Sequence, residues 1–134
     1  MPSFGKKSRE QLATCHPKLQ KVFNEVIQFV DCSVLKGHRG QKEQDEAFER
    51  GNSKVKYPNG RHNSKPSRAV DGVPYTIKGR WKEYERFGYF SGYVLGTAKQ
   101  MGIDLIWGND WDGDFEVKDT NFKDRPHFEL GKEE

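Results

Sequence analysis

The sequence has few cysteines, no long apolar run and little hydrophobic material. Its two cysteines, Cys15 and Cys32, fit neither a CxxC redox pair nor half of a zinc finger, so two reduced thiols are the simplest interpretation. No segment approaches the roughly 20 apolar residues of a membrane span, and residues 1–13 lack the apolar core of a signal peptide. We therefore expect synthesis in the cytosol and no stable membrane insertion.

Hydrophobic residues make up 33% and charged residues 32% of the 134-residue chain. Nine Phe, five Tyr and three Trp nevertheless supply bulky core material that a disordered chain would lack. A chain of this length can sustain one hydrophobic core. No internal repeat and no linker rich in Pro, Gly or Ser divides it. The composition predicts a single domain over residues 1–134, and a monomer is the default expectation.

The net charge is only +3, but it is unevenly distributed. Six basic residues lie in one segment, residues 50–68, that contains no Asp or Glu; we call it the basic segment. They are Arg50, Lys54, Lys56, Arg61, Lys65 and Arg68. Such a stretch attracts an anionic partner, and the charge alone does not distinguish nucleic acid from another acidic polymer.

Hydrophobic periodicity predicts three helices and four short strands. Residues 17–30 show the i, i+3, i+4 spacing of an amphipathic helix, with Pro17 suited to its first position. Further helices are expected at 41–50 and 81–101, and strands at 32–35, 69–75, 103–107 and 127–130. Because helices come early and strands late, the predicted class is α+β, with helices packed on a small antiparallel sheet. Residues 51–66 are predicted to form a loop, and residues 131–134 to fray.

The four histidines occur in different contexts. His16 precedes the first predicted helix, where a capping role is the default, and His38 lies in a turn without an obvious partner. His62 lies in a polar loop that leads into an apolar strand. His127 follows Asp124-Arg-Pro and begins the last predicted strand. The last two histidines are therefore the candidates for chemistry.

Asp71 is a carboxylate in a strand whose other residues include Val70 and Val73. Burying an ionised Asp is costly unless it is paired or bound to a metal, although Asp71 could also cap a turn with Gly72. Two neutral imidazoles and a carboxylate suit zinc and leave a fourth tetrahedral position for a water molecule. The candidate zinc ligands are His62, Asp71 and His127.

A hydrolase of this kind also needs a general base near the water and a donor for the oxyanion that develops. Asp124 and Arg39 are the natural candidates for these two roles. Each signal is weak alone, because a single His or Asp on a strand is more often structural than ligating.

The motifs that carry these residues resemble those of the zinc peptidases that include VanX, VanY-type D-alanyl-D-alanine carboxypeptidases and the L-alanyl-D-glutamate endolysins of tailed phages. The match is strongest to the endolysin branch and covers almost the whole chain. The motifs are Gly37-His-Arg39 followed by Gln44, Asn59-Gly-Arg-His62 leading to Asp71, Trp107-Gly-Asn-Asp-Trp111, and Asp124-Arg-Pro-His127-Phe-Glu-Leu. The resemblance implies a fold like that of the hedgehog and D-Ala-D-Ala peptidase domains.

The resemblance also implies roles for individual residues. It makes the three candidate ligands a zinc site and Asp124 the general base or acid. Arg39 would bind and polarise the substrate carbonyl. Gln44 would support the site through a hydrogen bond to the substrate or to Arg39. Carboxypeptidase members usually have Glu where this chain has Asp124.

The chain departs from the family pattern in two places. His62 and Asp71 are nine residues apart, where several relatives place them seven apart, and the additional residues fall in a loop around Pro66. Asn109 replaces a common glycine, and Asn tolerates a positive φ. Three acidic residues then alternate in a loop that lacks a full EF-hand pattern, so calcium binding there is an open alternative. They are Asp110, Asp112 and Asp114.

The function implied is hydrolysis of the peptidoglycan stem peptide at the L-alanyl-D-glutamate bond by a phage endolysin. Such an enzyme would be made in the host cytoplasm and would reach the periplasmic wall after release through a holin. The expected partner is peptidoglycan rather than nucleic acid, and no separate wall-binding domain is expected. The nearer alternative is a D-alanyl-D-alanine carboxypeptidase or dipeptidase. The more distant one is a non-enzymatic protein that binds nucleic acid or metal.

Overall fold

The computed structural model describes residues 2–118, 120, 122–132 and 134. Its elements follow the order helix, helix, strand, helix, short 3-10 turn, strand, helix, strand, strand. They are α1 (Lys6–Ala13), α2 (Pro17–Val26), β1 (Cys32–Lys36), α3 (Gln41–Glu49), η1 (Arg61–Asn63), β2 (Ala69–Pro74), α4 (Tyr84–Gln100), β3 (Leu105–Trp107) and β4 (His127–Leu130). Among the described residues, no helix combines the length and the apolar character needed to cross a membrane.

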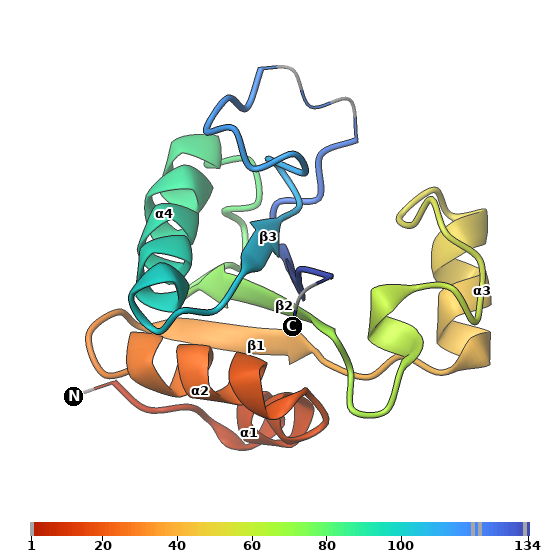
Figure 1. The fold of residues 1–134 in the computed structure, drawn as a ribbon, viewed down its shortest axis with the longest axis horizontal. Helices are drawn as coiled ribbons and strands as arrows, with labels where there is room; N and C mark the ends of the chain where they lie inside the picture. Colours follow the sequence, from red (N-terminus) through yellow and green to blue (C-terminus); the bar gives the residue numbers. More distant parts are fainter. Residues whose placement is uncertain (1, 119, 121, 133) are drawn as a thin grey trace.

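The four strands form one sheet in the order β1-β2-β4-β3, and every neighbouring pair is antiparallel. Figure 1 shows α1 and α2 together beneath β1, with α4 at one end of the molecule and α3 at the other. The predicted α+β class with a small antiparallel sheet is confirmed. The pairing of β2 with β4 sets Asp71 directly opposite His127, which brings together two side chains that are far apart in the sequence.

Aromatic side chains fill the core between the sheet and the helices. Phe23 of α2 and Phe90 of α4 both meet Phe128 of β4, with ring centroids 5.7 Å and 6.4 Å apart. Gly72 lies in β2 directly against the Phe23 ring, where a Cβ atom would come within 2.7 Å of Cε1. Asp71 therefore precedes a glycine that is required for packing within a strand, and the alternative reading of Asp71 and Gly72 as a turn cap is wrong.

Some predicted boundaries differ from the structure. The helix expected at 17–30 ends at Val26, because the amides of Gln28 and Phe29 bond to carbonyls three residues back and the α-helical pattern stops. The helix expected at 81–101 begins at Tyr84, after a turn in which the Glu83 amide bonds to the Arg80 carbonyl. Helix α1 was not expected, since it buries only Ser8 and Leu12 and shows no apolar stripe. The strand expected at 103–107 is limited to Leu105–Trp107.

The prediction that the C-terminal residues fray is wrong for the part that the structure describes. The Arg68 guanidinium donates to the carbonyl oxygens of Gly131 at 3.2 Å and Glu134 at 2.9 Å. Lys18 Nζ lies 2.6 Å from Glu134 Oε1. These contacts join the end of the chain to α2 and to the segment that leads into β2; residue 133 lies outside the described residues.

Candidate metal centre and active site

His62 is buried in the short turn η1 and is oriented by a main-chain carbonyl. Its Nδ1 lies 2.7 Å from the carbonyl oxygen of Gly37. Because a carbonyl oxygen can only accept, the neutral imidazole carries its proton on Nδ1 and its lone pair on Nε2. Nε2 is 3.3 Å from Asp71 Oδ1. In its neutral form the histidine therefore directs the Nε2 lone pair toward the point where Asp71 also lies.

Asp71 lies near the middle of β2, with its side chain 17% exposed. Burial raises the pKa of Asp71, but the adjacent His62 and His127 outweigh burial and hold that pKa well below its usual range. Arg39 Nη2 adds a positive charge 3.7 Å from Oδ2. The carboxylate is thus ionised inside the protein, and cationic or metal-binding neighbours are needed to balance it.

His127 begins β4 and is oriented by a carboxylate. Its Nε2 lies 2.8 Å from Glu129 Oε1, and its Nδ1 lies 3.7 Å from Asp71 Oδ1. Burial lowers the pKa of His127, but the carboxylates of Asp71 and Glu129 outweigh burial and raise it to about 9 in the metal-free protein. Protons and a metal ion therefore compete for Nδ1.

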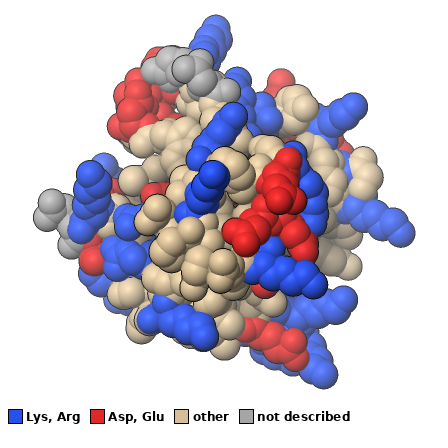
Figure 2. Space-filling view, turned by 90° about the vertical axis from the view of Figure 1, so that its right-hand side faces the viewer, with Lys and Arg blue, Asp and Glu red and all other residues tan. Residues whose placement is uncertain are grey.

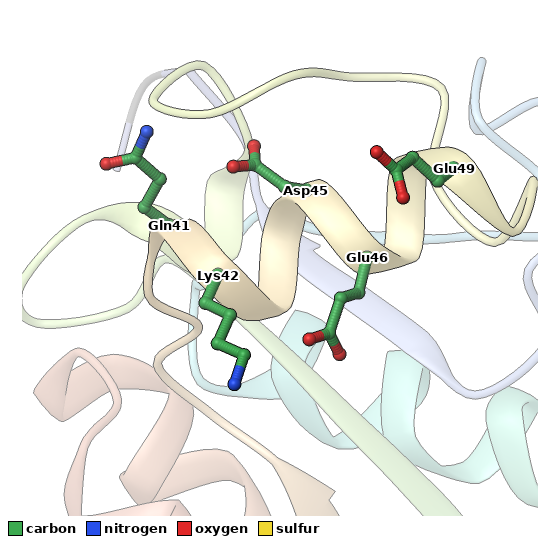
Figure 3. A pocket seen from close by; sticks show the side chains of 5 residues that line it. All are labelled: Gln41, Lys42, Asp45, Glu46 and Glu49. Carbon is green, nitrogen blue, oxygen red and sulfur yellow. The ribbon is translucent and has the colours of Figure 1, made fainter.

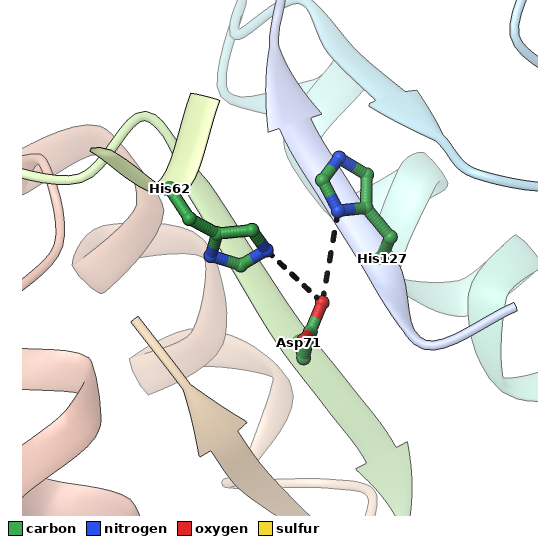
Figure 4. Close-up of side chains that lie close together, drawn as sticks. All are labelled: His62, Asp71 and His127. Carbon is green, nitrogen blue, oxygen red and sulfur yellow. Dashed lines mark ion pairs between the residues drawn. The ribbon is translucent and has the colours of Figure 1, made fainter. Parts of the chain in front are cut away.

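The side chains of His62, Asp71 and His127 converge on one point (Figure 4), and one donor atom from each lies within 4.8 Å of the others. Among the described residues, neither His62 Nε2 nor Asp71 Oδ1 has a hydrogen-bond partner, although both atoms are buried. Buried polar atoms without partners are rare in proteins and indicate a missing ion or water. The donor set of two imidazole nitrogens and one carboxylate oxygen fits zinc. The structure thus brings the three predicted ligands together, while their binding of zinc remains a prediction.

Asp124 is the fourth predicted residue of this cluster, with Oδ2 3.9 Å from His127 Nδ1. Burial, helped by the charge of Asp71, raises the pKa of Asp124 to about 6. Gly108 allows this placement, because a Cβ atom there would collide with the main-chain oxygen of Asp124. The Asp124 amide donates to the Gly108 carbonyl at 2.7 Å. A carboxyl group with this pKa can exchange a proton near neutral pH.

Arg39 reaches the cluster from the loop before α3, and a buried amide holds it. Its Nη1 donates to Gln44 Oε1 at 3.1 Å, and its amide nitrogen donates to the His62 carbonyl at 2.8 Å. Gln44 Nε2 donates to Ser53 Oγ at 2.9 Å and to the Val55 carbonyl at 2.6 Å. Protein groups therefore occupy both ends of the Gln44 amide. Of its two expected roles, the geometry favours support of Arg39 over contact with substrate.

Sequence reasoning missed three residues of this network. Asn63 Nδ2 donates to the Arg39 carbonyl at 2.9 Å and lies 3.2 Å from Gln44 Oε1, and nothing in the local sequence distinguished Asn63 from an ordinary loop residue. Glu129 contacts His127 Nε2, and Arg61 pairs with Glu129. The alternation in His-Phe-Glu-Leu did carry a signal for Glu129, because residues two apart on a strand share a face.

Known proteins share the sequence pattern and the fold of this chain. The family model described as phage L-alanyl-D-glutamate peptidase matches residues 2–131. The chain belongs to the phage L-alanyl-D-glutamate peptidase family. It is 33% identical to the L-alanyl-D-glutamate peptidase of Escherichia phage T5, with 95% of this chain and 96% of that protein aligned. The resemblance of its motifs to the endolysin branch is thereby confirmed.

A solved structure supports the fold of this family member. The crystal structure of the Serratia marcescens L-Ala D-Glu endopeptidase ChiX superposes with a TM-score of 0.74 at 27% sequence identity. The match covers 97% of this chain and 91% of that one. The similarity therefore extends over the sheet, the helices and the loops that carry the candidate site.

The three arginines of the basic segment form ion pairs or hydrogen bonds with other groups of the protein. Arg50 pairs with Glu46 at 3.0 Å and Arg61 with Glu129 at 3.3 Å, while Arg68 holds the C-terminal carbonyls. Its exposed cations are Arg50, Lys54, Lys56 and Lys65. Figure 2, which views the α3 side, shows Lys and Arg on several sides of a compact acidic group. This face is of mixed charge rather than uniformly basic.

Two surface cavities lie apart from the cluster. Figure 3 shows one of them on the outer face of α3, lined by Gln41, Lys42, Asp45, Glu46 and Glu49. The second, of about 1050 Å³, lies between α4 and the loop after β3. None of the three candidate ligands lines either cavity. Trp111 lines the second cavity and also contacts His127, with ring centroids 5.3 Å apart.

The acidic loop after β3 gathers three carboxylates, with one oxygen of each within 4.8 Å of the others. The group consists of Asp110, Asp112 and Asp114. Asp110 is buried, and its carboxylate accepts a hydrogen bond from the amide of Phe115 at 3.0 Å. This hydrogen bond stabilises the conformation of the loop. Calcium binding there stays an untested alternative.

Replacing His62 with Ala should remove one of three metal ligands. We expect zinc affinity to fall by several orders of magnitude, because only two of the three protein ligands that a catalytic zinc site uses would remain. Zinc per protein after dialysis, and competition with a chromophoric chelator, would measure the change. His38→Ala is the matched control, since His38 lies nearby but outside the cluster. Undiminished zinc occupancy in His62→Ala would refute the ligand assignment.

The metal-free protein should lose stability as the pH rises from about 6.5 through about 9. The folded-state pKa of His127 is raised to about 9, so its contribution is complete below the unfolded pKa of about 6.5 and disappears above about 9. The loss is on the order of 3 kcal/mol. Urea denaturation at a series of pH values would measure it, with His127→Gln as the comparison. A wild-type slope equal to that of His127→Gln would contradict this account.

Proposed function

We propose that this protein is a zinc-dependent peptidase that hydrolyses the L-alanyl-D-glutamate bond of the peptidoglycan stem peptide. The observation that carries the proposal is the convergence of His62, Asp71 and His127, one donor atom of each lying within 4.8 Å of the others. Both imidazoles are held from outside by acceptors, which leaves their lone pairs directed inward. Membership of the peptidase family supplies the reaction.

Zinc bound by these three residues would act as a Lewis acid on the scissile carbonyl and would lower the pKa of a water molecule. The chain itself must then provide a proton acceptor, a cation for the developing oxyanion, and a fixed geometry. Asp124 and Arg39 lie on the edge of the cluster and fit the first two requirements. The hydrogen bonds to Gly37, Glu129 and Gln44 provide the third.

Asp124 serves as the general base and then as the general acid. Its raised pKa, about 6, leaves it ionised at neutral pH but close enough to that pH to release the proton again. The carboxylate would accept the proton of the attacking water and deliver it to the leaving amine of D-glutamate. Burial of the carboxyl group and the neighbouring charge of Asp71 produce this tuning.

Arg39 serves to bind and polarise the substrate carbonyl. Its side chain is only 18% exposed, and its guanidinium lies between Gln44 on one side and Asp71, 3.7 Å away, on the other. A cation held in this way stabilises a developing negative charge without having to reorganise during the reaction. The Gln44 amide contributes by positioning Arg39.

Residues 1–134 would act as a catalytic domain, as a monomer whose partner is peptidoglycan. We propose that it is made in the host cytoplasm and reaches the wall during lysis, after release through a holin. Its exposed lysines in the basic segment would face an acidic polymer. Family membership favours this function over a D-alanyl-D-alanine carboxypeptidase and over a protein that only binds nucleic acid or metal.

Replacing Asp124 with Asn should give a folded, zinc-loaded and inactive protein. We expect turnover of purified murein to fall roughly 10²- to 10⁴-fold, because the amide cannot accept the proton. Mass spectrometry of the digest should show, for the wild type, new L-alanine carboxyl termini and new D-glutamate amino termini. Asp45→Asn, which changes an exposed acid on the outer face of α3, is the matched control.

Three results would count against the proposed function. Release of terminal D-alanine without new L-alanine termini would indicate the carboxypeptidase alternative. Equal activity of Asp124→Asn and the wild type would remove Asp124 from the mechanism. A wild type that binds zinc but cleaves no murein would favour the non-enzymatic alternative.

A further inference from the structure

Glu129 and His127 form a pair on the face of β4 that carries the metal cluster. They are two residues apart, so their side chains share one face of the strand, whereas Phe128 and Leu130 between and beyond them are fully buried in the core. Glu129 Oε1 lies 2.8 Å from His127 Nε2. This is the ring nitrogen that faces away from Asp71. Glu129 therefore holds the imidazole through Nε2 and leaves Nδ1 facing the cluster.

The Glu129 carboxylate decides which nitrogen of His127 carries the proton. An ionised carboxylate only accepts hydrogen bonds. In the neutral imidazole the proton must then lie on Nε2, and the lone pair on Nδ1, which is 3.7 Å from Asp71 Oδ1 and 3.9 Å from Asp124 Oδ2. For His62 the main-chain carbonyl of Gly37 has the same effect. The two histidines thus use opposite ring nitrogens toward the cluster.

Arg61 holds Glu129 in place from the other side. Its Nε lies 3.3 Å from Glu129 Oε2, and its Nη2 donates to the Leu130 carbonyl at 2.7 Å. Burial raises the pKa of Glu129, but the hydrogen bond from His127 and the charge of Arg61 outweigh burial and lower it. Arg61 also directly precedes His62 in η1. One ion pair therefore joins the segment that carries His62 to the strand that carries His127.

We propose that Glu129, held by Arg61, is a positioning residue of the metal centre that fixes His127 in the Nε2-protonated form and thereby sets the affinity for zinc. The inference rests on the zinc dependence proposed above. A carboxylate behind a metal-bound histidine orients the ring and makes it a stronger donor. The Arg61 and Glu129 pair also aligns the two ligand-bearing segments before the metal arrives. If the ion pair between Arg61 and Glu129 only stabilised the fold, its loss would not change the tautomer of His127.

The test compares Glu129→Gln with the wild type. The amide is nearly the same size but carries no charge, and it can turn its NH₂ group toward Nε2 and favour the wrong tautomer. We expect zinc affinity, measured by competition with a chromophoric chelator, to fall roughly 10- to 100-fold. Glu83→Gln is the matched control, because Glu83 also pairs with an arginine, Arg80 at 2.6 Å, on an exposed surface.

A second measurement requires no variant. Long-range ¹H–¹⁵N NMR spectra of the zinc-loaded wild type should show the His127 proton on Nε2, with Nδ1 shifted by the metal. A proton on Nδ1 would overturn the inference, and so would zinc affinity in Glu129→Gln equal to that of the wild type. A wild type that binds no zinc would instead overturn the proposed function. The two failures are therefore distinguishable.

Discussion

The ionised carboxylate of Asp71 in the middle of β2 is the constraint on which the rest of the site depends. A charge at a position that is otherwise apolar is costly unless partners compensate it. The sheet provides one partner directly, because the register between β2 and β4 sets His127 opposite Asp71. η1 adds His62, and the loop before α3 adds Arg39. The residues of the site are thus the ones that compensate the buried negative charge of Asp71.

The second feature of the site is that a hydrogen bond to a neighbouring residue orients each histidine ligand and Arg39. Gly37 orients His62, Glu129 orients His127, and Gln44 orients Arg39. Gly108 lets the segment that carries Asp124 approach closely enough for an amide–carbonyl hydrogen bond. Such support fixes catalytic groups before substrate binds, so less reorganisation is needed during the reaction. Gly37 and Gly108 support residues that are distant in the sequence, whereas Glu129 and Gln44 support residues within five positions of their own.

Sequence patterns predicted the sheet strands and the helices with apolar stripes, because periodic burial is recorded in the residue order. They missed α1, which buries little beyond Leu12, and they missed the attachment of the C-terminal residues through Arg68. Asp71 stood out because its charge conflicts with its strand. The roles of Asn63 and Arg61 could not be predicted, since both depend on contacts between distant segments. Only the sheet register and the loop packing reveal them.

The central claim is that zinc binds among His62, Asp71 and His127. Crystals of the zinc-loaded protein, measured on both sides of the zinc absorption edge, would locate the ion directly. The account predicts one strong anomalous peak about 2.0–2.2 Å from His62 Nε2, an Asp71 carboxylate oxygen and His127 Nδ1. A peak bound instead by the acidic loop of Asp110, Asp112 and Asp114, or by His127 Nε2, would contradict it.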